Sequence, residues 1–130
     1  MEGNEIRLKH LADNVYTDAV VSETEDSDGI MLSTFADGKL FSGKDEDYFT
    51  AFRKLRDSLL TEGYGMCCAG ARINAVQSGM MAGTDRVYLV SLGEKAVQSN
   101  VRGIFDYVDM DNFPDSAEQD EFTEKFYRSI

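Results

Sequence analysis

Apolar residues recur at helical spacing in the middle of the chain. The repeating positions are Tyr48, Phe52, Leu55 and Leu59, and the positions expected to face away from them are Arg53, Lys54, Arg56 and Asp57. Because this spacing places one apolar stripe along a helix, we expect a helix over about residues 47 to 62, ended by Gly63. Ser42 or Asp45 is expected to cap its first turn.

A second helix signal lies near the end of the chain, after Pro114. Asp115 and Glu118 have the spacing of a capping box, in which two side chains satisfy free N–H groups of the first helical turn. An apolar stripe follows at Phe122, Phe126 and Ile130. The pattern predicts a helix over about residues 116 to 129 that packs by this stripe.

Alternating and short apolar runs predict strands elsewhere. The runs cover residues 15 to 21, 30 to 35, 39 to 41, 64 to 71 and 86 to 92, whereas residues 76 to 82 and 101 to 108 are ambiguous. Asp37-Gly38 favours a tight hairpin turn, and the polar run of residues 22 to 28 is expected to close the first strand. The sequence therefore predicts an α+β fold, an antiparallel or mixed sheet of four to six strands with one central helix and one C-terminal helix.

Length and composition fit one domain over residues 1 to 130. A chain of 130 residues with 42% hydrophobic residues can bury one core. The first fifteen residues mix charges among isolated apolar residues, and no run approaches the roughly 18 uncharged residues of a membrane span. We therefore expect a soluble cytoplasmic protein.

The net charge of −11 is unevenly distributed. Residues 1–38 carry −7, residues 39–103 carry +2 and residues 104–130 carry −6. Such a field repels phosphate backbones and anionic lipids, so we expect no nucleic-acid or membrane binding, but it attracts a basic protein partner. The contact residues expected near Tyr107 and Phe113 are Asp106, Asp109, Asp111 and Asp115. The alternative is that the acidity only confers solubility.

The segment from Cys67 to Ser78 is the candidate for a ligand pocket. Its candidate residues are Cys67, Cys68, Arg72, Asn74 and Ser78. Arg72 could clamp a carboxylate or phosphate, with the amide and hydroxyl orienting the ligand. The alternative is a structural loop in which Arg72 pairs with an acid.

The residues match no catalytic or metal-binding motif well. A cysteine nucleophile would need His10, the only histidine, and nothing in the sequence places it near either thiol. A calcium loop that starts at Asp109 has Pro114 where glycine is required and Asp120 where a bidentate glutamate is required. We therefore expect no metal, cofactor or nucleotide, and the oligomeric state stays open.

One central segment carries a resemblance. It runs through the residues Cys68-Ala69-Gly70-Ala71-Arg72-Ile73-Asn74 and Ser78-Gly79-Met80 to Ile104-Phe105-Asp106. Over about residues 49 to 106 the chain resembles a family of small uncharacterised bacterial domains, some associated with toxin neighbourhoods. The resemblance implies a compact bacterial domain of immunity type, with no established activity.

Two function hypotheses follow. The favoured one is a non-catalytic protein-interaction domain, an acidic immunity-type inhibitor of a basic partner. The other is a small ligand-binding or enzymatic domain that uses the segment from Cys67 to Ser78.

Overall fold

The computed structural model describes residues 2–130. In chain order its helices and strands are β1 (Glu2–His10), β2 (Val15–Asp26), β3 (Gly29–Ala36), β4 (Lys39–Asp45), α1 (Tyr48–Thr61), β5 (Tyr64–Met66), β6 (Ala75–Val76), β7 (Arg86–Leu89), β8 (Val101–Gly103) and α2 (Ser116–Ser129). Three short 3-10 helices are η1 (Ala69–Ala71), η2 (Gly79–Met81) and η3 (Gln98–Asn100).

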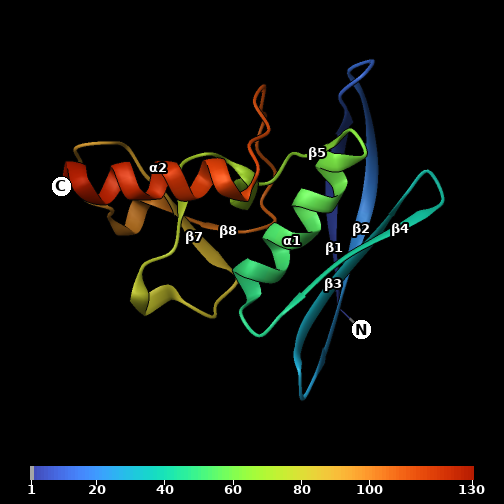
Figure 1. Cartoon of the computed structure of the whole chain (residues 1–130), viewed down its shortest axis with the longest axis horizontal. Coiled ribbons are helices and arrows are strands. Elements are labelled where there is room, and N and C mark those ends of the chain that lie inside the picture. The colour runs from blue at the N-terminus through green and yellow to red at the C-terminus, as the bar shows by residue number, and fades with distance from the viewer. Residues whose placement is uncertain (1) are drawn as a thin grey trace.

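Five strands form an antiparallel sheet in the order β4-β3-β2-β1-β5. A small antiparallel sheet in the order β6-β7-β8 lies on the other side of α1, next to α2 (Figure 1). The predicted α+β fold, with one sheet of four to six strands, a central helix and a C-terminal helix, is confirmed. The fold is thus a large sheet, a central helix, and a second layer that contains α2.

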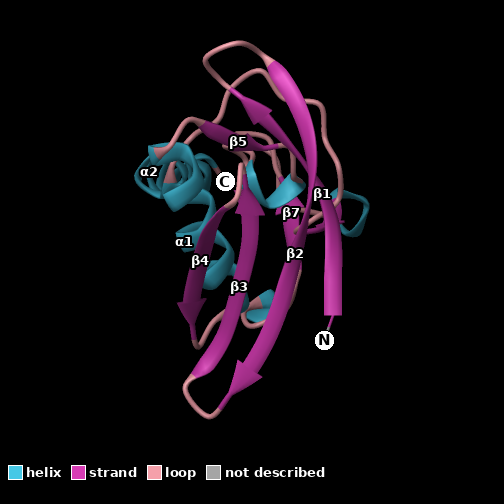
Figure 2. Ribbon diagram, turned by 90° about the vertical axis from the view of Figure 1, so that its right-hand side faces the viewer, coloured by secondary structure: helices cyan, strands magenta, loops and turns pink. Residues whose placement is uncertain are grey.

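The helix α1 packs on one face of the large sheet, and no helix of residues 2–130 covers the opposite face (Figures 1 and 2). Phe52, Leu55 and Leu59 of α1 are completely buried, as the helical spacing predicted. The helix also lies very close to β4, because a Cβ added at Gly43 would come within 2.3 Å of the Ala51 carbonyl oxygen. Glycine at this position therefore allows the helix to approach the strand.

Arg56 corrects the expected orientation of the helix. It was expected to face solvent, but it is 1% exposed. The helix is covered by the sheet on one side and by η1 and α2 on another, so a wider arc of its surface is buried than one apolar stripe predicts. Ser42 and Asp45 lie in β4, and the cap of α1 is Asp47, whose side chain accepts the Thr50 N–H.

The C-terminal helix begins as the capping box predicted. Asp115 accepts the Glu118 N–H at 2.9 Å, and the Glu118 side chain accepts the Asp115 N–H at 3.1 Å. Its apolar stripe is only partly buried, since Phe126 is 2% exposed whereas Ile130 is 50% exposed. The stripe therefore secures the middle of α2 and leaves its end in solvent.

The strands differ from the sequence pattern in three respects. β1 was not predicted. β2 continues through the polar run to Asp26, because residues 22 to 26 of β2 pair with β3. The predicted strand over residues 64 to 71 is wrong after Met66, where the chain bends into η1. Of the two ambiguous segments, residues 76 to 82 contain the last residue of β6 and then η2, whereas residues 101 to 108 begin with β8.

Within residues 2–130, the helices are too short or too polar to span a bilayer.

Candidate functional site

One side of β1 is paired only along its last residues. Strand β5 pairs with only the last three residues of β1, and the Cys67 N–H then donates to the Arg7 carbonyl at 2.9 Å. Beyond this bond the chain turns away, and Cys68 pairs with Tyr107 instead. Among the described residues, no strand therefore pairs with the first five residues of β1 on this side, although β2 pairs with them on the other.

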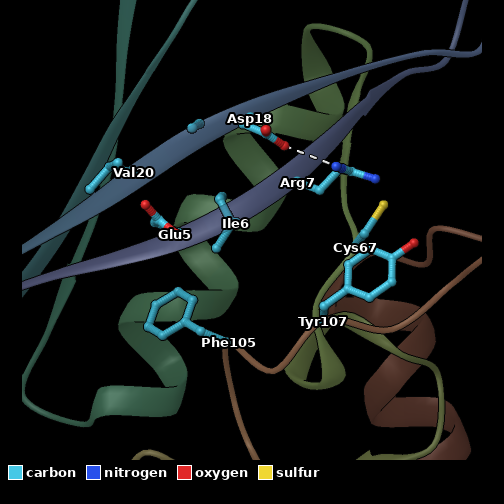
Figure 3. Close-up of a pocket in the computed structure, with 9 residues that line it drawn as sticks. Glu5, Ile6, Arg7, Asp18, Val20, Cys67, Phe105 and Tyr107 are labelled. Carbon is cyan, nitrogen blue, oxygen red and sulfur yellow. Dashed lines mark hydrogen bonds and ion pairs between the residues drawn. The ribbon is translucent and has the colours of Figure 1, made fainter.

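A hollow of about 480 Å³ opens where the sheet splits (Figure 3). The residues that line it are Glu5, Ile6, Arg7, Asp18, Ala19, Val20, Cys67, Phe105 and Tyr107. They come from β1, β2, the residue after β5, and the segment that follows β8. The unpaired edge of β1 therefore forms one wall of this hollow, and the 105–107 segment lies opposite.

The hollow has an apolar part and a charged part. Ile6 is 6% exposed and belongs to the main core, and the half-buried Phe105 packs against that core. On the other face of β1, the Arg7 Nε donates to the Asp18 Oδ1 at 3.2 Å, and this bond raises the pKa of the Arg7 guanidinium. Glu5 is exposed beside this pair. The local charge is therefore acidic, since Asp18 neutralises Arg7 and leaves Glu5.

Tyr107 stands at the mouth of the hollow with 57% of its surface exposed. The Arg7 guanidinium carbon lies 5.8 Å from the centre of its ring. The neighbouring backbone is held in place, because the Ala69 N–H donates to the Asp106 carbonyl at 2.8 Å and the Val108 N–H donates to the Cys67 carbonyl at 3.2 Å. An exposed aromatic ring is thus presented on a fixed backbone.

A second, smaller hollow of about 190 Å³ continues along the same edge. It is lined by Asn4, Asp85, Arg86, Gly103, Ile104, Phe105 and Asp106. Phe105 borders both hollows, so the two lie between β1 and the 103–107 segment. We refer to the two hollows together as the β1 groove.

The two cysteines are buried and protonated. Cys67 is 1% exposed and Cys68 is fully buried. Burial raises the pKa of both thiols, and for Cys67 the positive charges of Lys9 and Arg7 oppose this effect only in part. Since the thiolate is the reactive form of cysteine, neither thiol is activated as a nucleophile.

His10 lies away from the thiols. Its Nδ1 is 2.9 Å from the Asp13 Oδ1, and its ring packs on Tyr64 with 5.2 Å between ring centres. It is three residues along β1 from Arg7, the residue that pairs with Cys67, which corresponds to about 10 Å of extended chain. The structure therefore does not assemble a cysteine-histidine pair.

The remaining residues of the predicted ligand pocket lie outside the β1 groove. The Arg72 Nε is 3.4 Å from the Asn74 Oδ1, and the Asn74 Nδ2 donates to the Val90 carbonyl at 3.0 Å. Ser78 precedes η2 and makes no capping bond. Of the five predicted pocket residues, only Cys67 lines the groove. The ligand-pocket hypothesis itself stays a prediction.

The four predicted partner-binding acids are exposed but do not form one cluster. Asp106 lines the groove and accepts the Gly103 N–H at 2.9 Å. Asp109 is close enough to Cys67 to influence its titration, and Asp111 follows on the same connection. Asp115 caps α2 and lines a different hollow. Partner binding by these acids stays a prediction.

The groove residues of β1 and β2 were not among the site residues predicted from the sequence. Glu5, Ile6 and Arg7 belong to the alternating pattern Glu-Ile-Arg-Leu-Lys, which is typical of a half-buried strand. Asp18 lies in a predicted strand, but its pairing with Arg7 depends on the register between β1 and β2. The pattern could have revealed the strand, although not its free edge.

The chain matches no family model, and no curated protein matches its sequence.

Proposed function

We propose that the chain is a non-catalytic protein-binding domain that recognises a basic partner through the acidic surface around Tyr107, as an immunity-type inhibitor would. The observation that supports the proposal best is the exposure of the Tyr107 ring beside the β1 groove. This ring is 57% exposed, borders the β1 groove and stands between the exposed acids Asp106 and Asp109. Aromatic anchors surrounded by complementary charge are typical of binding hot spots.

The charge balance near this surface favours a cationic ligand. In the groove, Arg7 is paired with Asp18, while Glu5 and Asp85 form no ion pair among the residues that the structure describes. Two other bases are nearby: Arg86 lines the smaller hollow, and Lys9 lies over the Tyr16 ring at 5.7 Å and over the Phe113 ring at 5.9 Å. The residues that line the groove still include four acids, Glu5, Asp18, Asp85 and Asp106, against the two bases Arg7 and Arg86. The acids that remain would steer a basic protein toward the groove.

The environments of the two thiols and of the segment around Arg72 support an enzymatic function less well than a protein-binding function. Both thiols are held in the protonated form by burial. The side chain of Asn74 is committed to the main chain of residue 90, which closes the segment as a structural loop. A protein-binding role needs only the exposed surface, so it is the function that this geometry supports best.

The proposal is tested by capture of a partner and by charge neutralisation. The tagged chain is purified from its native host at low salt, and retained proteins are identified by native mass spectrometry and released by a salt titration. We expect a stoichiometric basic protein that salt releases. A bare chain, or a chain that carries a small molecule, would contradict the proposal.

Variants then locate the contact surface. Tyr107→Ala, and separately the triple change Asp109→Asn, Asp111→Asn and Asp115→Asn, should each weaken binding of the captured protein at least tenfold. Asparagine is used because it preserves the cap at Asp115. The matched control neutralises three acids elsewhere, Glu94→Gln, Glu121→Gln and Glu124→Gln, and should change affinity less than twofold. Equal effects of the two triple variants would show that only net charge matters.

A further inference from the structure

We propose that the unpaired edge of β1 binds an extended segment of the basic partner as an additional strand, with apolar and basic side chains alternating along that segment. The inference rests on the proposed function, because the positive charge of the partner is taken from it. It adds the mode of binding and the sequence pattern that the groove selects.

The main chain of β1 offers the hydrogen-bonding groups that strand addition needs. The Arg7 carbonyl points to the edge side, because it accepts the Cys67 N–H. In an antiparallel ladder, the N–H and C=O groups of every second residue point to the same side. The main-chain groups of Gly3 and Glu5 therefore point into the groove, where no described strand pairs with them.

The first residues of β1 lack lysine, proline and a bulge, three of the features that commonly block pairing at a sheet edge. Exposed edges of natural sheets are commonly blocked by lysine, proline or a bulge. The opposite edge strand, β4, carries Lys39 and Lys44, whereas residues 2–6 contain neither lysine nor proline. The uninterrupted pairing of β1 with β2 also shows no bulge. An unprotected edge beside a hollow is a surface on which another strand can pair.

The two faces of the edge predict the side chains of the added strand. On the core side, Ile6 and Phe105 line the groove and would contact apolar side chains. On the open side, Glu5 is exposed and would contact a lysine or arginine. Because successive residues of a strand point to opposite faces, a bound segment should alternate apolar and basic residues.

A defined peptide tests the inference independently of the natural partner. The probe is a blocked seven-residue peptide, Lys-Val-Lys-Val-Lys-Val-Lys, added to the full chain at low salt. Amide exchange followed by NMR should show at least tenfold slower exchange at Gly3 and Glu5, and no change at the amides of β4. Three control peptides are used: the same sequence with glutamate in place of lysine, the lysine peptide N-methylated at the valines, and the lysine peptide N-methylated at the lysines.

Two variants separate the backbone and charge contributions. Glu5→Pro removes one edge N–H and should weaken peptide binding at least tenfold. Glu5→Lys keeps the main-chain N–H and C=O groups of the edge and should weaken binding at least tenfold through charge repulsion with the lysines of the peptide. Thermal unfolding verifies that each variant is folded, and Glu5→Lys keeps the test valid if the proline variant is not. The inference is overturned if the wild-type chain does not bind the lysine peptide, if both N-methylated peptides bind as well as the parent, or if protection appears elsewhere.

The natural partner distinguishes this inference from the proposed function. If the captured basic protein is released by salt and depends on Tyr107, but leaves the exchange of Gly3 and Glu5 unchanged, the function stands and strand addition is wrong. If no basic protein is captured while the peptide protects these amides, the β1 edge binds strands but the proposed function is wrong.

Discussion

Arg56 on α1 donates from its Nη2 to the Oε1 of Gln119 on α2 at 2.6 Å, inside the core. The Gln119 amide in turn donates to the carbonyls of Gly70, at 2.9 Å, and Arg72, at 2.7 Å. Arg56 also bonds Asp57 through its Nε at 2.8 Å. These two side chains therefore join α1, η1 and α2, although burial lowers the pKa of Arg56 and so opposes its charge.

This network predicts a strong coupling between Arg56 and Gln119. Gln119→Leu removes one acceptor and two donor bonds from buried groups, and should lower the free energy of unfolding by about 1–3 kcal/mol. Arg56→Met should also destabilise, because it leaves Gln119 without its charged donor. The double variant should lose less than the sum of the single losses, since both partners are then apolar.

Urea unfolding followed by circular dichroism measures the coupling. Gln98→Ala is the control, because Gln98 is exposed and should change the free energy of unfolding by less than about 0.5 kcal/mol. Strictly additive losses for the Arg56 and Gln119 variants would show that the bond does not contribute to stability.

Gly43→Ala should destabilise the contact between β4 and α1. The added Cβ would lie 2.3 Å from the Ala51 oxygen and 2.4 Å from the Leu55 nitrogen, which are main-chain atoms of the helix. The helix must then move away from the strand, at a cost of about 1–3 kcal/mol. Gly79→Ala is the matched control, since a Cβ there meets nothing within 4 Å. Thermal unfolding of the two variants makes the comparison, and equal melting temperatures would contradict the close approach.

The parts of the fold that could be predicted from the sequence are those that local patterns determine. Both helices were predicted because Phe52, Leu55 and Leu59 repeat at helical spacing and because Asp115 and Glu118 form a local capping box. Arg56 was placed wrongly because its burial depends on a second layer, formed by residues more than ten positions away in the chain. Local periodicity does not contain such information.

The candidate site was less predictable for the same reason. The groove depends on where β5 stops pairing with β1 and on the bridge between Cys68 and Tyr107, which joins distant parts of the chain. Asp106 and Tyr107 were proposed as contact residues from charge and aromatic character, whereas the local pattern around Glu5 and Asp18 indicates a strand but not a groove. A free strand edge is a property of topology, so it became visible only in the assembled sheet.

The raised thiol pKa values predict a specific pH dependence of stability. A native state in which Cys67 and Cys68 hold their protons above the usual pKa of about 8.5 binds more protons than the unfolded chain at that pH. The free energy of unfolding should therefore fall as pH rises through about 8.5. Urea unfolding at pH 7.5 and pH 9.5 should show a smaller fall for Cys68→Ala than for the wild type. An equal fall would assign the pH dependence to other groups.

The same burial predicts slow chemical modification. At pH 7.5, iodoacetamide should label Cys67 and Cys68 only as fast as the native structure opens, and at least a hundredfold faster in denaturing urea. Mass spectrometry of labelled peptides measures both rates. Rapid labelling of native Cys67 alone would instead show that its thiol is accessible from the β1 groove and would support the ligand-binding hypothesis.

Asp47 connects the start of α1 with the loop before β7, and this predicts different effects for two substitutions. One carboxylate oxygen accepts the Thr50 N–H at 3.0 Å, and the other accepts the Gly83 N–H at 3.1 Å. Asp47→Ala removes both bonds and should lower the free energy of unfolding by about 1–2 kcal/mol. Asp47→Asn keeps one oxygen for the helix cap but cannot accept both N–H groups. It should therefore retain most of the stability while the Gly83 amide exchanges faster, which urea unfolding and NMR amide exchange measure separately. If the asparagine variant leaves exchange at Gly83 unchanged, the loop is held by other contacts and Asp47 acts only as a cap.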